Sequence, residues 1–259
     1  MRPAARALLF LLLAITTLLG CSKATSPPAE FTATGNASGQ ISLSGESTLK
    51  CVSTTGPVSV EGEGLGTVRW FLAKYAVAPT QDRAHQALDQ IIPTYTRAGD
   101  TLVFDVAMPP ARDVYSSATT TLGIPFGMNC VIENSPTRVV ASDLRGTLRV
   151  RGTDSVTVER HVGSCDIVVS RGALVIEVAV PDSGACVAQT GEGIIDLRLP
   201  ASSSATLTAR TASGTISVTG LALADRVDGT GYVFGRLGTG AATFQLETKK
   251  GNITVTGLP

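Results

Sequence analysis

Apolar and polar residues alternate along most of this chain, and one five-residue pattern recurs. In each copy a glycine comes first, and the third and fifth residues are apolar or small. Residues 172–176, 193–197 and 214–218 follow this pattern at intervals of 21 residues, and an offset pair at 163–167 and 184–188 has the same interval. Because residues two apart in a strand share a face, each copy predicts a short strand with one buried face.

The fixed interval favours a coiled architecture. A period near 20 residues is typical of solenoids, in which each coil stacks on the previous one. Equivalent positions would then lie about 4.8 Å apart in buried apolar columns, and each glycine would permit the positive φ of a sharp corner. We therefore predict a mainly β chain, a β-solenoid of short strands with 21-residue coils and one helix. A β-sandwich, whose turns can have similar spacing, is the alternative.

Further copies of the pattern lie outside this run. They begin at Gly39, Gly56, Gly66 and Gly251. The interval from Gly214 to Gly251 exceeds 21 residues, which predicts either one longer coil or a loss of register near the end.

One helix is expected, over residues 80–92. Thr80 can cap its first turn, Pro93 ends it, and an apolar stripe recurs at helical spacing. The stripe comprises Ala84, Ala87, Leu88 and Ile91. A strand over residues 101–107 follows, and no later segment has the pattern of a helix.

The first residues indicate export and lipid attachment. Two arginines precede the apolar run 7–19, which is shorter than the ~20 residues of a membrane-spanning helix and suits a signal peptide. Residues 18–21, Leu-Leu-Gly-Cys, resemble a bacterial lipobox. That resemblance implies cleavage after Gly20 and attachment of acyl chains such as palmitate to Cys21. An ordinary secretory signal is the alternative.

These features divide the chain into four parts. Residues 1–20 are the signal peptide and 21–30 a lipidated tether rich in Ser and Pro. Residues 31–136 form an N-terminal β region that contains the helix, and 137–259 form the C-terminal repeats. The predicted location is the cell envelope, anchored to a membrane by lipid. By resemblance to known sorting preferences, Ser22 favours the outer membrane.

Composition narrows the classes of function. Lys and Arg together number 21, as do Asp and Glu, so the chain lacks the basic excess of a nucleic-acid-binding protein. The two histidines, His85 and His161, have no metal-ligand spacing to a cysteine and are expected at the surface. No metal, cofactor or catalytic residue is predicted.

Four cysteines follow the lipid-attachment residue. An even number in an oxidising compartment predicts two disulfides. Cys165 and Cys186 occupy equivalent positions 21 residues apart, so stacked coils would bring them within bonding range. Cys51 and Cys130 would form the second bond by elimination.

The chain resembles a family of bacterial envelope proteins called putative adhesins, also described as the head domain of a putative auto-transporter adhesin. The resemblance covers most of residues 31–259 and is strongest at 87–106 and 211–220, with an echo of the latter at 248–257. It implies a β-helical domain and brings no catalytic residues with it. The four cysteines do not belong to the family pattern.

Three functions are compatible with these features. The preferred one is a non-enzymatic, lipid-anchored envelope protein with a structural or adhesive role, binding an envelope protein or a polysaccharide. A polysaccharide-acting enzyme would need carboxylates gathered on one face; Asp166, Asp182 and Asp196 are the candidates, with Arg198 nearby. An envelope-stress signalling partner is the third. The single tryptophan, Trp70, shares a predicted face with Val68 and is assigned to the core.

Overall fold

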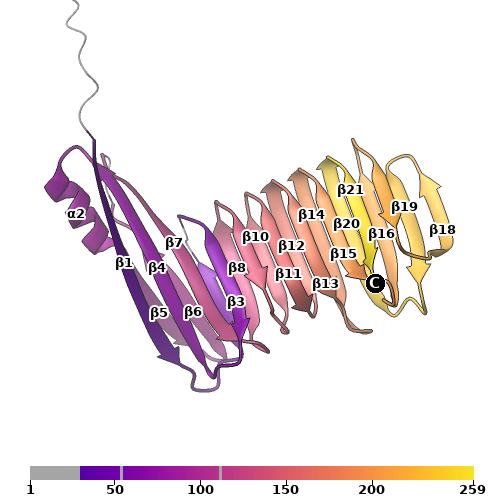
Figure 1. The fold of residues 1–259 in the computed structure, drawn as a ribbon, viewed down its shortest axis with the longest axis horizontal. Coiled ribbons are helices and arrows are strands. Elements are labelled where there is room, and N and C mark those ends of the chain that lie inside the picture. Colours follow the sequence, from indigo (N-terminus) through magenta and orange to yellow (C-terminus); the bar gives the residue numbers. More distant parts are fainter. Residues whose placement is uncertain (1–29, 53–54, 111–112) are drawn as a thin grey trace, which may run out of the picture. The chain divides into compact units, whose positions relative to one another are not determined.

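The computed structural model describes residues 30–52, 55–110 and 113–259, and residues 31–259 form one compact unit (Figure 1). The unit consists of two large mixed β-sheets and the helix α2 (Gln81–Gln90). The first sheet contains, in spatial order, β1 (Phe31–Ser42), β4 (Thr67–Ala78), β7 (Tyr115–Pro125), β3 (Val58–Glu63), β9 (Val139–Ser142), β11 (Val156–Val162), β13 (Leu174–Ala179), β15 (Ile195–Pro200), β21 (Ile253–Leu258) and β17 (Ile216–Thr219). The second contains β18 (Ala224–Gly229), β19 (Tyr232–Leu237), β16 (Ala205–Thr211), β20 (Ala242–Lys250), β14 (Ala185–Glu192), β12 (Cys165–Arg171), β10 (Leu148–Gly152), β8 (Asn129–Ser135), β2 (Thr48–Val52), β6 (Thr101–Ala107) and β5 (Ile92–Ala98).

The prediction of a mainly β chain is confirmed. From β8 to β16 successive strands alternate between the two sheets, and neighbours within each sheet run parallel. Antiparallel pairs occur near the two ends, in β1–β4–β7, β5–β6 and β16–β19–β18 (Figure 1). Two sheets that share a buried core are also compatible with the sandwich alternative.

Stacked strands align equivalent buried residues in columns. One column in the second sheet follows the printed register from strand to strand, and each of its residues is at most 1% exposed. It contains Leu102, Leu49, Cys130, Leu148, Cys165, Cys186, Phe244 and Leu207. The 21-residue repeat therefore aligns β12 with β14, and likewise β13 with β15, as the spacing predicts.

The last copies of the repeat stack in an unexpected order. Ile195 pairs with Ile253, and Ile253 in turn pairs with Ile216, so β21 lies between β15 and β17. The expected stacking of residues 214–218 directly on 193–197 is therefore wrong. The antiparallel strands β18 and β19 reverse the chain after β17, and β20 then enters between β14 and β16. This return path accounts for the long interval before Gly251.

Corner glycines adopt the positive φ that their place in the pattern predicts. Gly172, Gly193 and Gly251 have φ of 108°, 153° and 145°. A Cβ added to Gly193 would overlap the carbonyl oxygen of Gly172, and one added to Gly251 would overlap the carbonyl of Gly193. The backbones of neighbouring coils thus meet too closely for any other residue at these corners.

The predicted helix is confirmed, with slightly shorter bounds. The Thr80 side chain caps it by accepting a hydrogen bond from the Arg83 N–H at 3.3 Å, and the whole predicted apolar stripe is buried. The helix packs on β1 and β4, where an added Cβ on Gly35 would lie 3.7 Å from Leu88. No strand was predicted between the helix and residue 101, yet β5 forms there and includes Pro93. As an edge strand, β5 tolerates a residue without an N–H.

Candidate functional site

The residues predicted for lipid attachment, Gly20 and Cys21, lie outside the described residues. The described part of the chain contains no helix with the length and hydropathy of a membrane span. It also contains no group of three His, Cys, Asp or Glu side chains placed to hold a metal ion.

The four remaining cysteines are buried free thiols. Cys165 and Cys186 are register partners, and their sulfurs lie 2.7 Å apart. This adjacency agrees with the repeat, although no bond joins the two atoms. Burial raises the pKa of Cys51 to about 12, so this thiol is protonated at neutral pH and is a poor nucleophile.

The geometry of the second predicted pair is different. Cys51 lies opposite Ile132, and Cys130 lies opposite Leu49. The two cysteines are therefore offset by two residues on neighbouring strands, which corresponds to a Cα separation of about 8 Å. Disulfides seldom span more than about 7 Å between Cα atoms, so the register does not favour a Cys51–Cys130 bond.

The acidic candidates for an enzyme do not meet in one groove. Asp166 lies on β12 of the second sheet, where it forms an ion pair with Arg151. Asp196 and Arg198 lie on β15 of the first sheet and pair with each other at 2.7 Å. Asp182 is exposed in a turn. Apart from Asp182, these groups have local ion-pair partners.

His161 is not a surface residue, contrary to expectation. It is 1% exposed, and its Nδ1 and Nε2 atoms lie 3.0 and 3.1 Å from the carbonyl oxygens of Leu144 and Ser164. Burial lowers the pKa of His161, while the two carbonyls act in the opposite direction. A β-bulge between Val158 and His161 shifts the register and turns the ring inward.

A different feature is the strongest candidate for function: the outward face of β1, β4 and β7, which we call the aromatic face. The inward side chains of β4, Val68, Leu72 and Ala76, are fully buried. Alternation therefore sends the intervening residues outward, and the register aligns them across the three strands. The face comprises Thr32, Thr34, Asn36, Ser38 and Gln40 of β1, Arg69, Phe71, Ala73, Tyr75 and Val77 of β4, and Tyr115, Ser117, Thr119, Thr121 and Gly123 of β7.

Three aromatic side chains protrude from this face. Phe71, Tyr75 and Tyr115 are 42%, 38% and 63% exposed. Tyr75 and Tyr115 come from neighbouring strands, and their ring centroids are 6.2 Å apart in an edge-to-face arrangement. Trp70, by contrast, points inward to Phe104 at a centroid distance of 6.3 Å, as predicted for a core residue.

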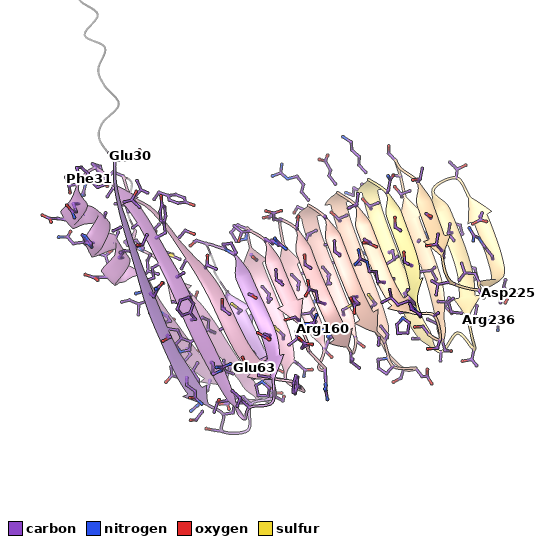
Figure 2. All side chains as sticks on the ribbon, viewed as in Figure 1. Glu30, Phe31, Glu63, Arg160, Asp225 and Arg236 are labelled. Atoms are coloured by element: carbon purple, nitrogen blue, oxygen red, sulfur yellow. The ribbon has the colours of Figure 1, made fainter. Side chains whose placement is uncertain are left out.

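A hollow of about 560 Å³ lies beside Phe71, at the end of the face where β1 finishes. Arg69 lines it and forms a bidentate ion pair with Glu63, in which the Nε–Oε2 distance is 2.8 Å. The Glu63 carboxylate lies over Gly123, which leaves room for it because it has no side chain. Figure 2 marks Glu63 at the opposite end of these strands from Phe31.

Further polar groups line the hollow, together with Trp70 and two glycines. The Gln40 side chain donates to the Thr67 hydroxyl at 2.7 Å, and Glu61 and Thr121 are exposed beside it. The ion pair with Glu63 raises the pKa of Arg69 and keeps it charged. The site thus offers an aromatic surface next to several hydrogen-bonding groups, an arrangement typical of ligand sites.

Sequence reasoning came close to this face but did not identify it. Alternation in β4 placed Val68 and Trp70 on the inner face, and continuing the same alternation would have put Phe71 and Tyr75 outward. The partnership of Tyr75 with Tyr115 depends on a pairing between distant strands, for which the sequence carries no local signal.

No family model matches this chain, and no curated protein matches it. Among solved structures, a putative cell adhesion protein from Clostridium sporogenes is 10% identical and has a TM-score of 0.47, with 87% of this chain and 100% of that chain covered. A putative adhesin and a putative lipid binding protein from Parabacteroides distasonis are each 9% identical, with TM-scores of 0.33 and 0.30; in both, 86% of this chain and 97% of that chain are covered. All three TM-scores are below 0.5.

Proposed function

We propose that the chain is a lipid-anchored protein of the bacterial cell envelope with a non-enzymatic binding role. Residues 18–21 support the anchor, through cleavage after Gly20 and acylation of Cys21. Two or more acyl chains give stable attachment, since each buried CH₂ contributes about 0.8 kcal/mol. The outer membrane is the proposed destination.

The exposed aromatic face carries the binding role. Exposed aromatic side chains gathered on one surface mark interaction sites, because burying them against a partner removes apolar area from water. Phe71, Tyr75 and Tyr115 occupy adjoining strands and are held by a fully buried inner layer. The same strands that form the core therefore hold the rings in fixed positions for a partner.

The stacked strands provide the scaffold for this face. We infer that the part from β8 to β15 is a β-solenoid, because the chain alternates between the sheets while each strand pairs in parallel with its counterpart one coil away. In the oxidising envelope, Cys165 and Cys186 would form a disulfide that links two coils, since their strands are already in register.

Two measurements test the proposal. Cells expressing the full chain are labelled with an alkyne palmitate analogue, and label is expected on the wild type and absent from Cys21→Ser. Isolated envelopes are then incubated with the purified Cys21→Ser chain, which cannot be acylated there, and with a Cys21→Ser/Phe71→Ala/Tyr115→Ala variant. Binding by the chain with the intact face alone is expected, and equal binding by both proteins would refute a role for the face.

A further inference from the structure

We propose that the aromatic face binds a neutral polysaccharide, with its sugar rings stacked on Phe71, Tyr75 and Tyr115. This inference rests on the binding role proposed above and specifies the ligand. Pyranose rings present flat patches of C–H bonds that pack on aromatic rings, and they present hydroxyl groups at their edges. A surface that recognises them therefore needs both exposed aromatic rings and dense hydrogen-bonding groups.

The spacing of the rings fits an extended chain of sugars. Phe71 and Tyr75 are four residues apart on one strand, a separation of about 13 Å. Tyr115 continues the row beyond Tyr75 on the adjoining strand, at a centroid distance of 6.2 Å. A polymer lying along β4 would thus meet aromatic rings at both ends of a segment several sugar rings long.

Hydrogen-bonding groups border the aromatic row on both sides. Every outward position of β1 from Thr32 to Gln40 carries an exposed hydroxyl or amide side chain. On the other side, β7 presents exposed Thr119 and Thr121 and partly exposed Ser117. These groups both donate and accept hydrogen bonds, as sugar hydroxyls do.

The chemistry of the face favours a glycan over a protein partner. The centre of a protein interface is apolar, and serine is depleted there. Here Ala73 lies between Phe71 and Tyr75 along β4, and small polar residues flank the two rings across the strands: Ser38 and Thr121 pair with Phe71, and Thr34 pairs with Tyr75.

The charges favour a neutral glycan over an anionic one. Around the hollow, Arg69 is paired with Glu63, and Glu61 adds a further exposed carboxylate. The local charge is therefore negative, which repels polyanions. The carboxylates and the guanidinium remain able to hydrogen-bond to sugar hydroxyls.

Calorimetric titration of the full chain in mild detergent provides the test. The probes are cellohexaose and chitohexaose, with polygalacturonate as the anionic comparison. Saturable binding of at least one neutral probe is expected, with no binding of polygalacturonate. Phe71→Ala and Tyr75→Ala should each weaken the binding about tenfold. Phe71→Trp should retain it.

Tyr95→Ala is the matched control. Tyr95 is 54% exposed on β5 of the second sheet, away from the aromatic face, and its removal should leave affinity unchanged. Circular dichroism confirms that each variant is folded. Absence of binding to both neutral probes, or an equal loss in Tyr95→Ala, would overturn the inference.

The outcome also separates this inference from the proposed function. If envelopes retain the Cys21→Ser chain but not its Phe71→Ala/Tyr115→Ala variant, and protease treatment of the envelopes abolishes retention, the partner is a protein. The binding role would then stand, while the glycan inference would fall. Loss of palmitate labelling bears only on the anchor.

Discussion

Replacing Gly193 by alanine should destabilise the folded unit strongly. Gly193 has a φ of 153°, and an added Cβ would overlap the backbone carbonyl of Gly172 in the neighbouring coil. Neither a rotamer change nor a side-chain shift relieves a clash with backbone. The two coils must therefore move apart at this corner.

The magnitude follows from the bonds at that corner. The positive φ contributes about 1–2 kcal/mol of strain for a residue with a Cβ. Moving the coils apart weakens two hydrogen bonds, from the Gly172 N–H to the Glu192 carbonyl at 2.8 Å and from the Thr190 hydroxyl to the Gly172 carbonyl at 3.3 Å. Each contributes about 1 kcal/mol. The free energy of unfolding should therefore fall by about 3–4 kcal/mol, and Tm by roughly 10 °C.

Urea and thermal unfolding, followed by circular dichroism, measure this loss. Gly66→Ala is the control, because nothing lies within 4 Å of its added Cβ. It should change stability by no more than about 0.5 kcal/mol. Equal stabilities for the two variants would refute the close stacking of coils at Gly193.

Two further predictions concern the core. Peptide mapping of the non-reduced envelope protein should recover a Cys165–Cys186 disulfide and no Cys51–Cys130 disulfide, and reduction should lower stability by about 3 kcal/mol; a Cys51–Cys130 peptide would contradict the register. Burial lowers the pKa of His161, so the folded state favours its neutral form. The resulting contribution to the free energy of unfolding is present above the unfolded pKa of about 6.5 and is lost as the pH falls through the folded pKa. Urea unfolding should show that the wild type loses stability between pH 7.5 and pH 5 and that His161→Gln loses less. Equal losses in both proteins would contradict the assignment of this pH dependence to His161.

The regular part of the fold could be predicted from the sequence because its signals are local. Alternation identified the buried faces, and the 21-residue interval aligned Cys165 with Cys186. Thr80 and the apolar stripe defined the helix. In each case, the residues that determine the structure lie within one coil or one neighbouring repeat.

The order of the last coils could not be predicted, because the competing copies are chemically alike. Ile216 and Val218 of one copy are identical in type to Ile253 and Val255 of the other. Either pair would fill the position next to Ile195 equally well. The reversal through β18 and β19 decides between them, and that reversal depends on pairing between distant strands.

The position of His161 could not be predicted from alternation, because a β-bulge interrupts the strand before it. Val156 and Val158 point inward, so a regular strand would send Arg160 inward and His161 outward. Instead Arg160 adopts a φ of 49°, and its guanidinium pairs outside with Asp143 at 2.6 and 2.8 Å. An ion pair with a residue just beyond β9 thus accompanies the bulge, and the alternation pattern of one strand does not reveal it.

Oxidative footprinting of the full chain bound to isolated envelopes tests the proposed binding surface most directly. Hydroxyl radicals modify exposed aromatic side chains, and mass spectrometry reports the modification at each residue. Phe71, Tyr75 and Tyr115 should be protected in the bound protein, while Tyr95 should be modified as in the free protein. Unchanged modification of the three face residues, or protection of Tyr95 alone, would contradict the assignment of the aromatic face as the binding surface.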